Sequence, residues 1–183
     1  MSHADICPPT AEVPIMKRTT AIALLALVLP LGLSAADSPR FRANLVGSSE
    51  VPSINTDGSG TFHSYLASDG LHYELTYRDL KGGAITQAHI HLGERHTNGG
   101  IMVWLCSNMA GSPAGVPSCQ SSPGRVVGII SSGDVVGPAT QGVTTGEFRA
   151  LVKSLHNGTA YANVHTEMFP SGEIRGHVTR YVP

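Results

Sequence analysis

The sequence from residue 37 onward predicts an all-β domain: an antiparallel, Greek-key-like β-sandwich or flattened barrel of about eight strands. Two observations support this class. Short β-prone runs recur between turn residues, and no helical periodicity runs through them. Glycine is abundant, with 21 residues, and charged residues make up only 14% of the chain, which suits a β-rich domain with many turns.

The expected strands follow one another at short intervals. Residues 71–77 alternate between apolar and polar side chains, as in a strand with one face in water. The Asp69-Gly70 pair before them is a favoured hairpin turn. The expected strands are Phe41–Val46, Thr61–Ala67, Leu71–Tyr77, Gln87–Leu92, Ile101–Cys106, Arg125–Ser131, Thr159–Thr166 and Glu173–Tyr181, with Glu147–Val152 as a further strand or a short helical turn.

The first 36 residues have the pattern of an export signal with an upstream extension. A short basic start at 16–18 precedes an apolar run at 21–33, which is too short to span a bilayer, and small residues follow at 34–36. We therefore expect a signal peptide over 16–36, cut after Ala36 or after Ala35, behind an upstream extension. Residues 37–183 then form one domain, and the protein is expected to be periplasmic or secreted.

Charge and motifs argue against several functions. The 12 Lys and Arg residues nearly balance the 13 Asp and Glu residues, for a net charge of −1, and no basic stripe occurs. Nucleic acid and anionic membranes are therefore poor candidate partners. The chain also lacks a Gly-x-Ser-x-Gly elbow, a P-loop and a dinucleotide-binding fingerprint.

Two cysteines belong to the expected domain. Cys7 precedes the signal peptide, which leaves Cys106 and Cys119. Export and an even count favour a disulfide between them, closing a loop rich in Ser, Pro and Gly. Such a closure stabilises a fold by about 3 kcal/mol. A copper-thiolate pair is the alternative, although no histidine stands near either cysteine in the sequence.

Histidines provide the most specific chemical signal. His89 and His91 flank Ile90 in an expected strand, so both imidazoles point to one face, about 7 Å apart along the strand. His165 stands in a similar segment, and the three imidazoles can meet if the two strands are neighbours. Neutral imidazole suits copper and zinc, and copper heads the divalent affinity order. We therefore expect a metal ion, copper, as the cofactor of an exported protein.

A fourth ligand is expected from His96, in the loop after His91, or from His177, on the last strand. The alternative is that these histidines are polar residues that hydrogen-bond across strands and fix their register. In that case the protein is a non-catalytic extracellular binding or matrix module without metal, whose partner is another exported protein.

Five motifs together resemble the CHRD domain, a module named from chordin and also found in secreted bacterial proteins. The likeness extends from about Phe41 to Val182 and implies a fold more readily than a function. The motifs are Glu50-Val51-Pro52, Ala88-His89-Ile90-His91-x-Gly93, Asn98-Gly99-Gly100, Ala162-Asn163-Val164-His165-Thr166 and Gly172-Glu173-Ile174-Arg175-Gly176.

The chain also resembles, more faintly, Cu,Zn superoxide dismutase, where a His-x-His strand segment and a later strand supply copper ligands. Of the zinc subsite of that family, only His96 is available here. The resemblance therefore implies a copper-only site, in which Arg175 is an anion-guiding charge or a structural residue. The expected functions are copper storage, copper delivery and superoxide dismutase-like redox chemistry.

Overall fold

The computed structural model describes residues 38–182. The predicted signal peptide and upstream extension, residues 1–36, lie outside the described residues. The strands are β1 Arg40–Val46, β2 Ser59–Ala67, β3 Gly70–Arg78, β4 Ile85–Leu92, β5 Ile101–Ser107, β6 Gly124–Ile130, β7 Ala160–Thr166, β8 Ile174–His177 and β9 Thr179–Tyr181. The helices are α1 Phe148–Asn157 and the short 3-10 turns η2 Gly47–Ser49, η3 Ser132–Asp134 and η4 Ala139–Gln141.

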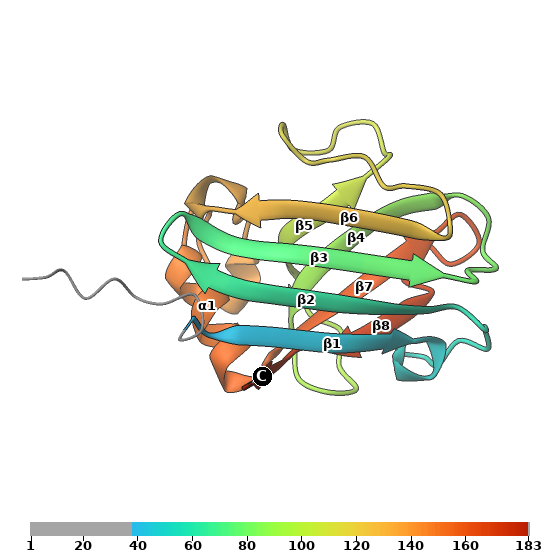
Figure 1. Cartoon of the computed structure of the whole chain (residues 1–183), viewed down its shortest axis with the longest axis horizontal. Coiled ribbons are helices and arrows are strands. Elements are labelled where there is room, and N and C mark those ends of the chain that lie inside the picture. The colour runs from blue at the N-terminus through green and yellow to red at the C-terminus, as the bar shows by residue number, and fades with distance from the viewer. Residues whose placement is uncertain (1–37, 183) are drawn as a thin grey trace, which may run out of the picture. The chain divides into compact units, whose positions relative to one another are not determined.

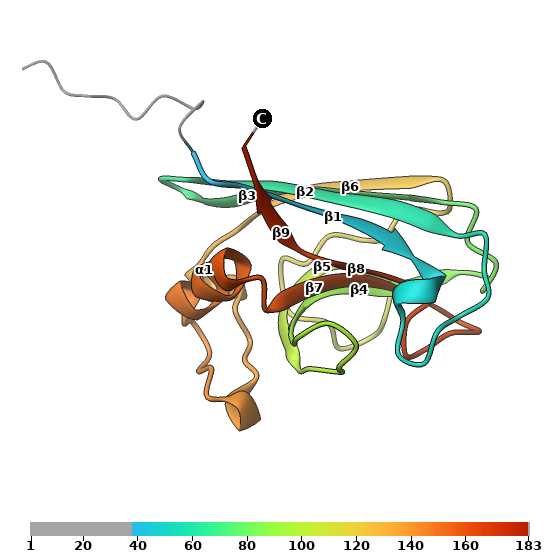
Figure 2. The same cartoon turned by 90° about the horizontal axis from the view of Figure 1, so that it is seen from below.

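These nine antiparallel strands form one nearly closed, barrel-like sheet, which confirms the predicted all-β class. The strands pair in the order β5-β4-β7-β8-β1-β2-β3-β6, and β9 pairs with β1. Figures 1 and 2 show β1, β2, β3 and β6 in one layer, here the front layer, and β4, β5, β7 and β8 in a second, here the back layer.

The front layer follows from an alternating sequence pattern. In β1, Phe41, Ala43 and Leu45 are at most 3% exposed, whereas Arg42 and Asn44 between them face solvent. Successive side chains of a strand point to opposite faces. One face of this layer therefore packs on the core, and the other face is exposed to solvent.

The hairpin predicted at Asp69-Gly70 joins β2 to β3, with Ala67 opposite Gly70. Gly70 has a φ of +145°, a region that side-chain-bearing residues rarely adopt. A Cβ at this position would also approach the carbonyl oxygen of Ile130 to 2.5 Å. Glycine is therefore required at this turn.

The region after β6 differs from the sequence prediction. A ten-residue helix, α1, stands where a strand or a short helical turn was expected at 147–152. The strand alternative is wrong, and the helix is longer than the expected turn. Leu151 and Leu155 are fully buried at a spacing of four residues, which supplies the apolar stripe of a short helix. Gly158 ends the helix in the left-handed conformation. Within residues 38–182, no helix has the length and apolar character needed to cross a membrane.

The core fills the space between the two layers. Phe62 of β2, Leu75 of β3 and Ile90 of β4 are fully buried. Tyr73 of β3 donates a hydrogen bond from its hydroxyl to the carbonyl oxygen of Leu105 in β5, at 2.6 Å. This bond satisfies a polar group within the core and connects the front layer to the back layer.

Cys106 and Cys119 form the predicted disulfide, with Cα atoms 5.0 Å apart. The amide of Asn108 reinforces the loop by donating to the carbonyl oxygens of Ile85, at 2.9 Å, and Cys119, at 3.0 Å. Because both sulfur atoms are used in the disulfide, the alternative of a copper-thiolate pair is wrong.

The back layer is buried on both faces, unlike the front layer. All seven residues of β7 are buried. Ala160, Ala162 and Val164 belong to the hydrophobic core. The opposite face carries buried polar side chains and is here called the polar face. Its members are His89 and His91 of β4, Asn163 and His165 of β7, and Arg175 of β8.

Candidate metal centre

Strand pairing brings the three predicted histidines together. β4 and β7 are antiparallel neighbours, with His89 opposite Asn163 and Gln87 opposite His165. Because side chains alternate along each strand, His89, His91 and His165 all point to the polar face. One ring nitrogen from each imidazole lies within 4.8 Å of one from each of the others. These three histidines are here called the histidine cluster.

Loops cover the histidine cluster. His89, His91 and His165 are only 1%, 8% and 6% exposed. The loop between β4 and β5 passes over His91, and the turn between β7 and β8 passes over His165, as the backbone hydrogen bonds of both rings show. Polar side chains that strand alternation would otherwise expose to water are therefore held in a low-dielectric environment.

Backbone carbonyls fix which nitrogen of two rings carries the proton. A carbonyl oxygen only accepts, so His91 donates from Nδ1 to Gly99, at 2.8 Å, and His165 donates from Nδ1 to Pro170, at 2.9 Å. The Nε2 atom of each neutral ring is left unprotonated and carries a lone pair. Metal-binding histidines characteristically donate their second nitrogen in this way.

The Nε2 lone pair of His165 has polar neighbours within the cluster. His89 Nδ1 lies 3.1 Å away and donates to it. The side-chain oxygen of Asn163, Oδ1, lies at the same 3.1 Å distance from this nitrogen; both atoms are acceptors in this tautomer, so this is a polar contact and supplies no proton to the lone pair. With Nδ1 as its donor, the neutral His89 ring likewise keeps its lone pair on Nε2.

Two of these nitrogen atoms are buried without a partner. His89 Nε2 and His91 Nε2 have no hydrogen-bond partner among the described residues. An unsatisfied buried polar atom costs about 1–3 kcal/mol. Two such atoms in one cluster, each carrying a lone pair, are an arrangement that a bound cation would satisfy.

Burial also keeps the rings in the form that binds metal. Desolvation, assisted by the neighbouring His165 and His91 rings, lowers the pKa of His89 to about 2. Desolvation likewise lowers the pKa of His91 to about 4 and the pKa of His165 below its ordinary value. Neutral imidazole is the ligating form, and the environment of the cluster favours it.

Aromatic rings surround the histidines. Trp104 of β5 lies edge-on to His89, with ring centroids 4.4 Å apart. Tyr161 of β7 stacks parallel to His91, with centroids 4.8 Å apart. Its hydroxyl also accepts a hydrogen bond from the backbone N–H of Gly99, at 3.1 Å. Tyr161 therefore holds both His91 and the loop above it.

Arg175 acts here as a structural cation. It is 5% exposed, and its guanidinium lies 4.1 Å from the Tyr161 ring centroid. It donates to the Glu50 carboxylate at 2.9 Å, to the Thr97 carbonyl at 2.9 Å and to Asn98 Oδ1 at 2.7 Å. These bonds tie the β4–β5 loop and the segment after η2 to β8. They use the charge internally and do not present it to solvent.

The structure brings neither proposed fourth ligand into the histidine cluster. His177 follows Arg175 on β8, and its Nε2 donates to the carbonyl oxygen of Gly158. His96 is exposed in the loop after β4 and has a φ of +62°. Both line a small surface pocket with Arg175 and Tyr161. The donor set of the cluster among the described residues is therefore three imidazoles.

Sequence reasoning missed three residues of this site. Asn163 stood in one of the family motifs but was not predicted to belong to the site. Tyr161 and Glu50 carried no recognisable chemical signal. Their roles depend on strand order and loop placement, which bring residues from distant parts of the chain into contact.

The donor set fits a transition-metal ion. Three neutral nitrogen ligands, two of them oriented by backbone carbonyls, suit copper or zinc and exclude the hard ions calcium and magnesium, which require oxygen ligands. If a metal is bound, His89, His91 and His165 would hold it, and Asn163 and the two carbonyl groups would orient them.

Comparison with known proteins identifies a family. No curated protein and no solved structure matches the chain. The family model of the CHRD domain matches residues 41–178, which include β2 to β8, all of β1 except Arg40, and none of β9. CHRD domains are typically extracellular, and the Cys106–Cys119 disulfide is consistent with that location. The chain therefore belongs to the CHRD domain family.

Proposed function

We propose that this protein is an exported copper-binding protein that stores or delivers copper through His89, His91 and His165. The observation that carries this proposal is the buried histidine cluster, in which two ring nitrogens lack partners. Copper is favoured because imidazole is among its common ligands.

Export is the second part of the proposal. The signal-peptide pattern at 16–36 supports it. The disulfide is consistent with an oxidising compartment such as the periplasm or the medium. We propose that residues 37–183, released by cleavage after Ala36 or Ala35, are the functional protein.

Storage or delivery is favoured over superoxide dismutase-like redox chemistry. A dismutase must admit a small anion to the metal and attract it with positive charge. The ring nitrogens of the cluster are buried. The guanidinium of Arg175 is occupied by Glu50, Thr97 and Asn98. A closed site suits retention and transfer of an ion better than rapid turnover.

The only tryptophan of the chain provides the test. Trp104 touches His89, so copper bound at the cluster should quench its fluorescence. We expect titration of the purified protein to quench Trp104 up to about one copper ion per chain, and that copper should survive desalting. Each of His89→Ala, His91→Ala and His165→Ala should weaken binding by roughly 100-fold or more.

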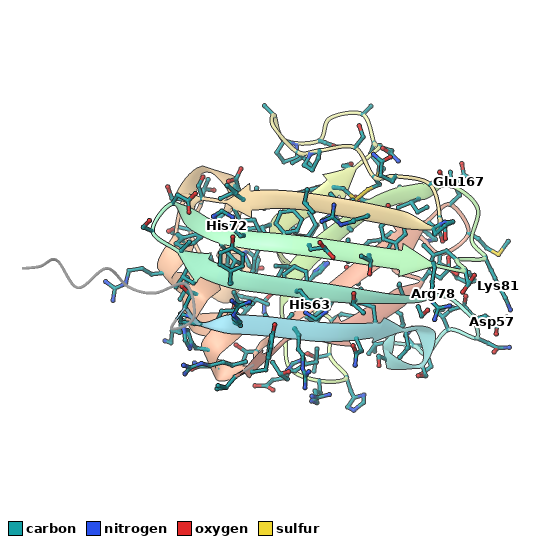
Figure 3. The ribbon with its side chains drawn as sticks, in the orientation of Figure 1. Asp57, His63, His72, Arg78, Lys81 and Glu167 are labelled. Carbon is teal, nitrogen blue, oxygen red and sulfur yellow. A yellow bond between two sulfur atoms is a disulfide. The ribbon has the colours of Figure 1, made fainter. Side chains whose placement is uncertain are left out.

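A surface histidine provides the matched control. His63 is exposed on β2, in the front layer, as Figure 3 shows. His63→Ala should leave both the quenching and the retained copper unchanged. Equal copper retention in all three cluster variants would refute the proposal and leave a metal-free binding module as the function.

A further inference from the structure

We infer that the histidine cluster selects monovalent copper, Cu(I), over the divalent ions Cu(II) and Zn(II). This inference rests on the proposed function, because it names the ion that the same site takes. The observation behind it is the combination of deep burial with a donor set that carries no negative charge.

The charge of the ligands is the first part of the argument. His89, His91 and His165 are the complete group of metal-capable side chains found together among the described residues. None of them is a carboxylate or a thiolate. A bound ion therefore keeps its full formal charge, since neutral imidazoles neutralise none of it.

The surroundings do not supply the missing negative charge. Of the two buried acids, Glu50 is paired with Arg175, so this pair is neutral overall. Glu173 is not among the side chains that meet at the cluster, and its carboxylate accepts hydrogen bonds from four donors, one of them the hydroxyl of Thr166. The other three donors are the Thr56 hydroxyl and the backbone N–H groups of Lys81 and Gly82.

Burial turns this lack of charge into selectivity. The cost of moving an ion from water into a low-dielectric site rises with the square of its charge, so a divalent ion pays about four times the cost of a monovalent one. The three rings are at most 8% exposed, so little water can solvate an ion bound between them and offset this cost.

The number of ligands points to the same ion. Zn(II) in a protein is almost always four-coordinate and tetrahedral, and Cu(II) prefers a square-planar or tetragonal arrangement. Cu(I), with a single positive charge, accepts fewer ligands. His96 and His177 are not in the cluster, and His177 is committed to Gly158. Three imidazoles under closed loops therefore satisfy Cu(I) and leave either divalent ion short of a ligand.

The decisive measurement compares dissociation constants on the wild-type protein. Cu(I) is titrated without oxygen against a coloured Cu(I) chelator, and Zn(II) and Cu(II) are titrated against chelators of known affinity. We expect Cu(I) to bind at least roughly 100-fold more tightly than either divalent ion. Ag(I), a monovalent ion that does not change oxidation state, should displace Cu(I) from the same site.

Two variants that add a carboxylate test the cause. Asn163→Asp places a negative charge beside His165, whose Nε2 lies 3.1 Å from the Asn163 side chain. Gln87→Glu adds one at the half-buried position opposite His165 and is the better tolerated change. In either variant, the ratio of the dissociation constants of the divalent ions to that of Cu(I) should fall by about tenfold or more. Asn44→Asp, an exposed change on β1, should have no effect.

The outcomes separate this inference from the proposed function. If Cu(II) or Zn(II) binds as tightly as Cu(I), and the histidine variants abolish that binding, the selectivity inference is overturned although the cluster still binds metal. If no ion is retained by the cluster, both fail. If Cu(I) and Ag(I) bind more tightly than the divalent ions, and either added carboxylate reduces that difference in affinity, the inference is supported.

Discussion

Glu50 and Arg175 form a buried ion pair across 125 residues of chain, with Arg175 Nε donating to the carboxylate at 2.9 Å. Both side chains are at most 7% exposed. The pair attaches the segment after η2 to β8, and the remaining donors of Arg175 attach the β4–β5 loop. Arg175 therefore joins two of the segments around the histidine cluster to β8, alongside the contact of Tyr161 with the β4–β5 loop.

Breaking this pair should be costly. Burial raises the pKa of Glu50 to about 7, against the lowering effect of Arg175, so stability is best measured at about pH 8, where the carboxylate is ionised. Glu50→Gln leaves an uncompensated buried guanidinium and should lower the free energy of unfolding by about 3–5 kcal/mol. Urea denaturation provides the measurement.

The exposed pair of Glu74 and Arg125 is a suitable comparison, since its atoms lie 2.6 Å apart but both side chains are at least 41% exposed. Glu74→Gln should cost less than about 1 kcal/mol. Equal losses in the two variants would show that the Glu50–Arg175 pair has no special structural role.

The disulfide should contribute measurably to stability. Cys106 and Cys119 close a loop with a separation of 13 residues. Replacing both by serine should lower the free energy of unfolding by about 3 kcal/mol, because the unfolded chain regains the entropy of the open loop. Thiol labelling of the unreduced, denatured protein checks the bond itself, since reaction at either cysteine would contradict it.

Alkaline pH should destabilise the protein through two core tyrosines. Burial raises the pKa of Tyr73 and of Tyr77 to about 12, and for Tyr73 the charge of Asp134 adds to the effect. In the unfolded chain both ionise near pH 10. The folded state therefore holds these protons more tightly, and the resulting stability is complete below about pH 10 and is lost as the pH rises towards about 12.

Two measurements follow the tyrosines. The tyrosinate absorbance of the folded protein should show part of its amplitude appearing only near pH 12, whereas the protein in guanidinium chloride should titrate fully near pH 10. In the double variant Tyr73→Phe, Tyr77→Phe, that late amplitude should disappear. Its persistence would mean that other tyrosines are responsible.

Replacing a cluster histidine by an apolar residue should abolish copper binding and should make the metal-free protein more stable. His89→Leu removes the buried, unpartnered Nε2 and should raise the free energy of unfolding of the metal-free protein by about 1 kcal/mol. Copper should stabilise the wild type by about 2.7 kcal/mol at a free concentration roughly 100 times its dissociation constant, and should leave His89→Leu unchanged.

Thermal unfolding with copper and with a chelator measures both effects. His63→Leu, at an exposed position of the front layer, should respond to copper as the wild type does. A cluster variant that is still stabilised by copper would place the bound metal elsewhere on the protein.

Export should remove the N-terminal segment. The pattern at 16–36 predicts that the protein recovered from the periplasm or medium begins at Asp37, or at Ala36 if cleavage follows Ala35. Mass spectrometry of the exported protein gives the answer directly. An intact segment containing Met16 in that material would contradict the proposed signal peptide.

Local sequence patterns predicted most of the strands and the orientation of key side chains. Alternation in β1 and β3 determined which residues enter the core, because a strand sends successive side chains to opposite faces. The same rule predicted that His89 and His91 share a face. At α1 local patterns left a strand and a short helical turn open, because an apolar pair at Leu151 and Leu155 is too short a signal to predict a ten-residue helix.

The sequence by itself determined the all-β class, the turn at Asp69-Gly70, the pairing of the two cysteines and the shared face of His89 and His91. Only the tertiary structure decided that β7 lies beside β4, which brings His165 to His89 across 76 residues. It also decided that loops cover the polar face, that Arg175 pairs with Glu50, and that His96 and His177 stay outside the cluster. The physical reason is that alternation is a local property of the backbone, whereas strand order and loop cover depend on contacts between distant segments whose energies no short pattern records.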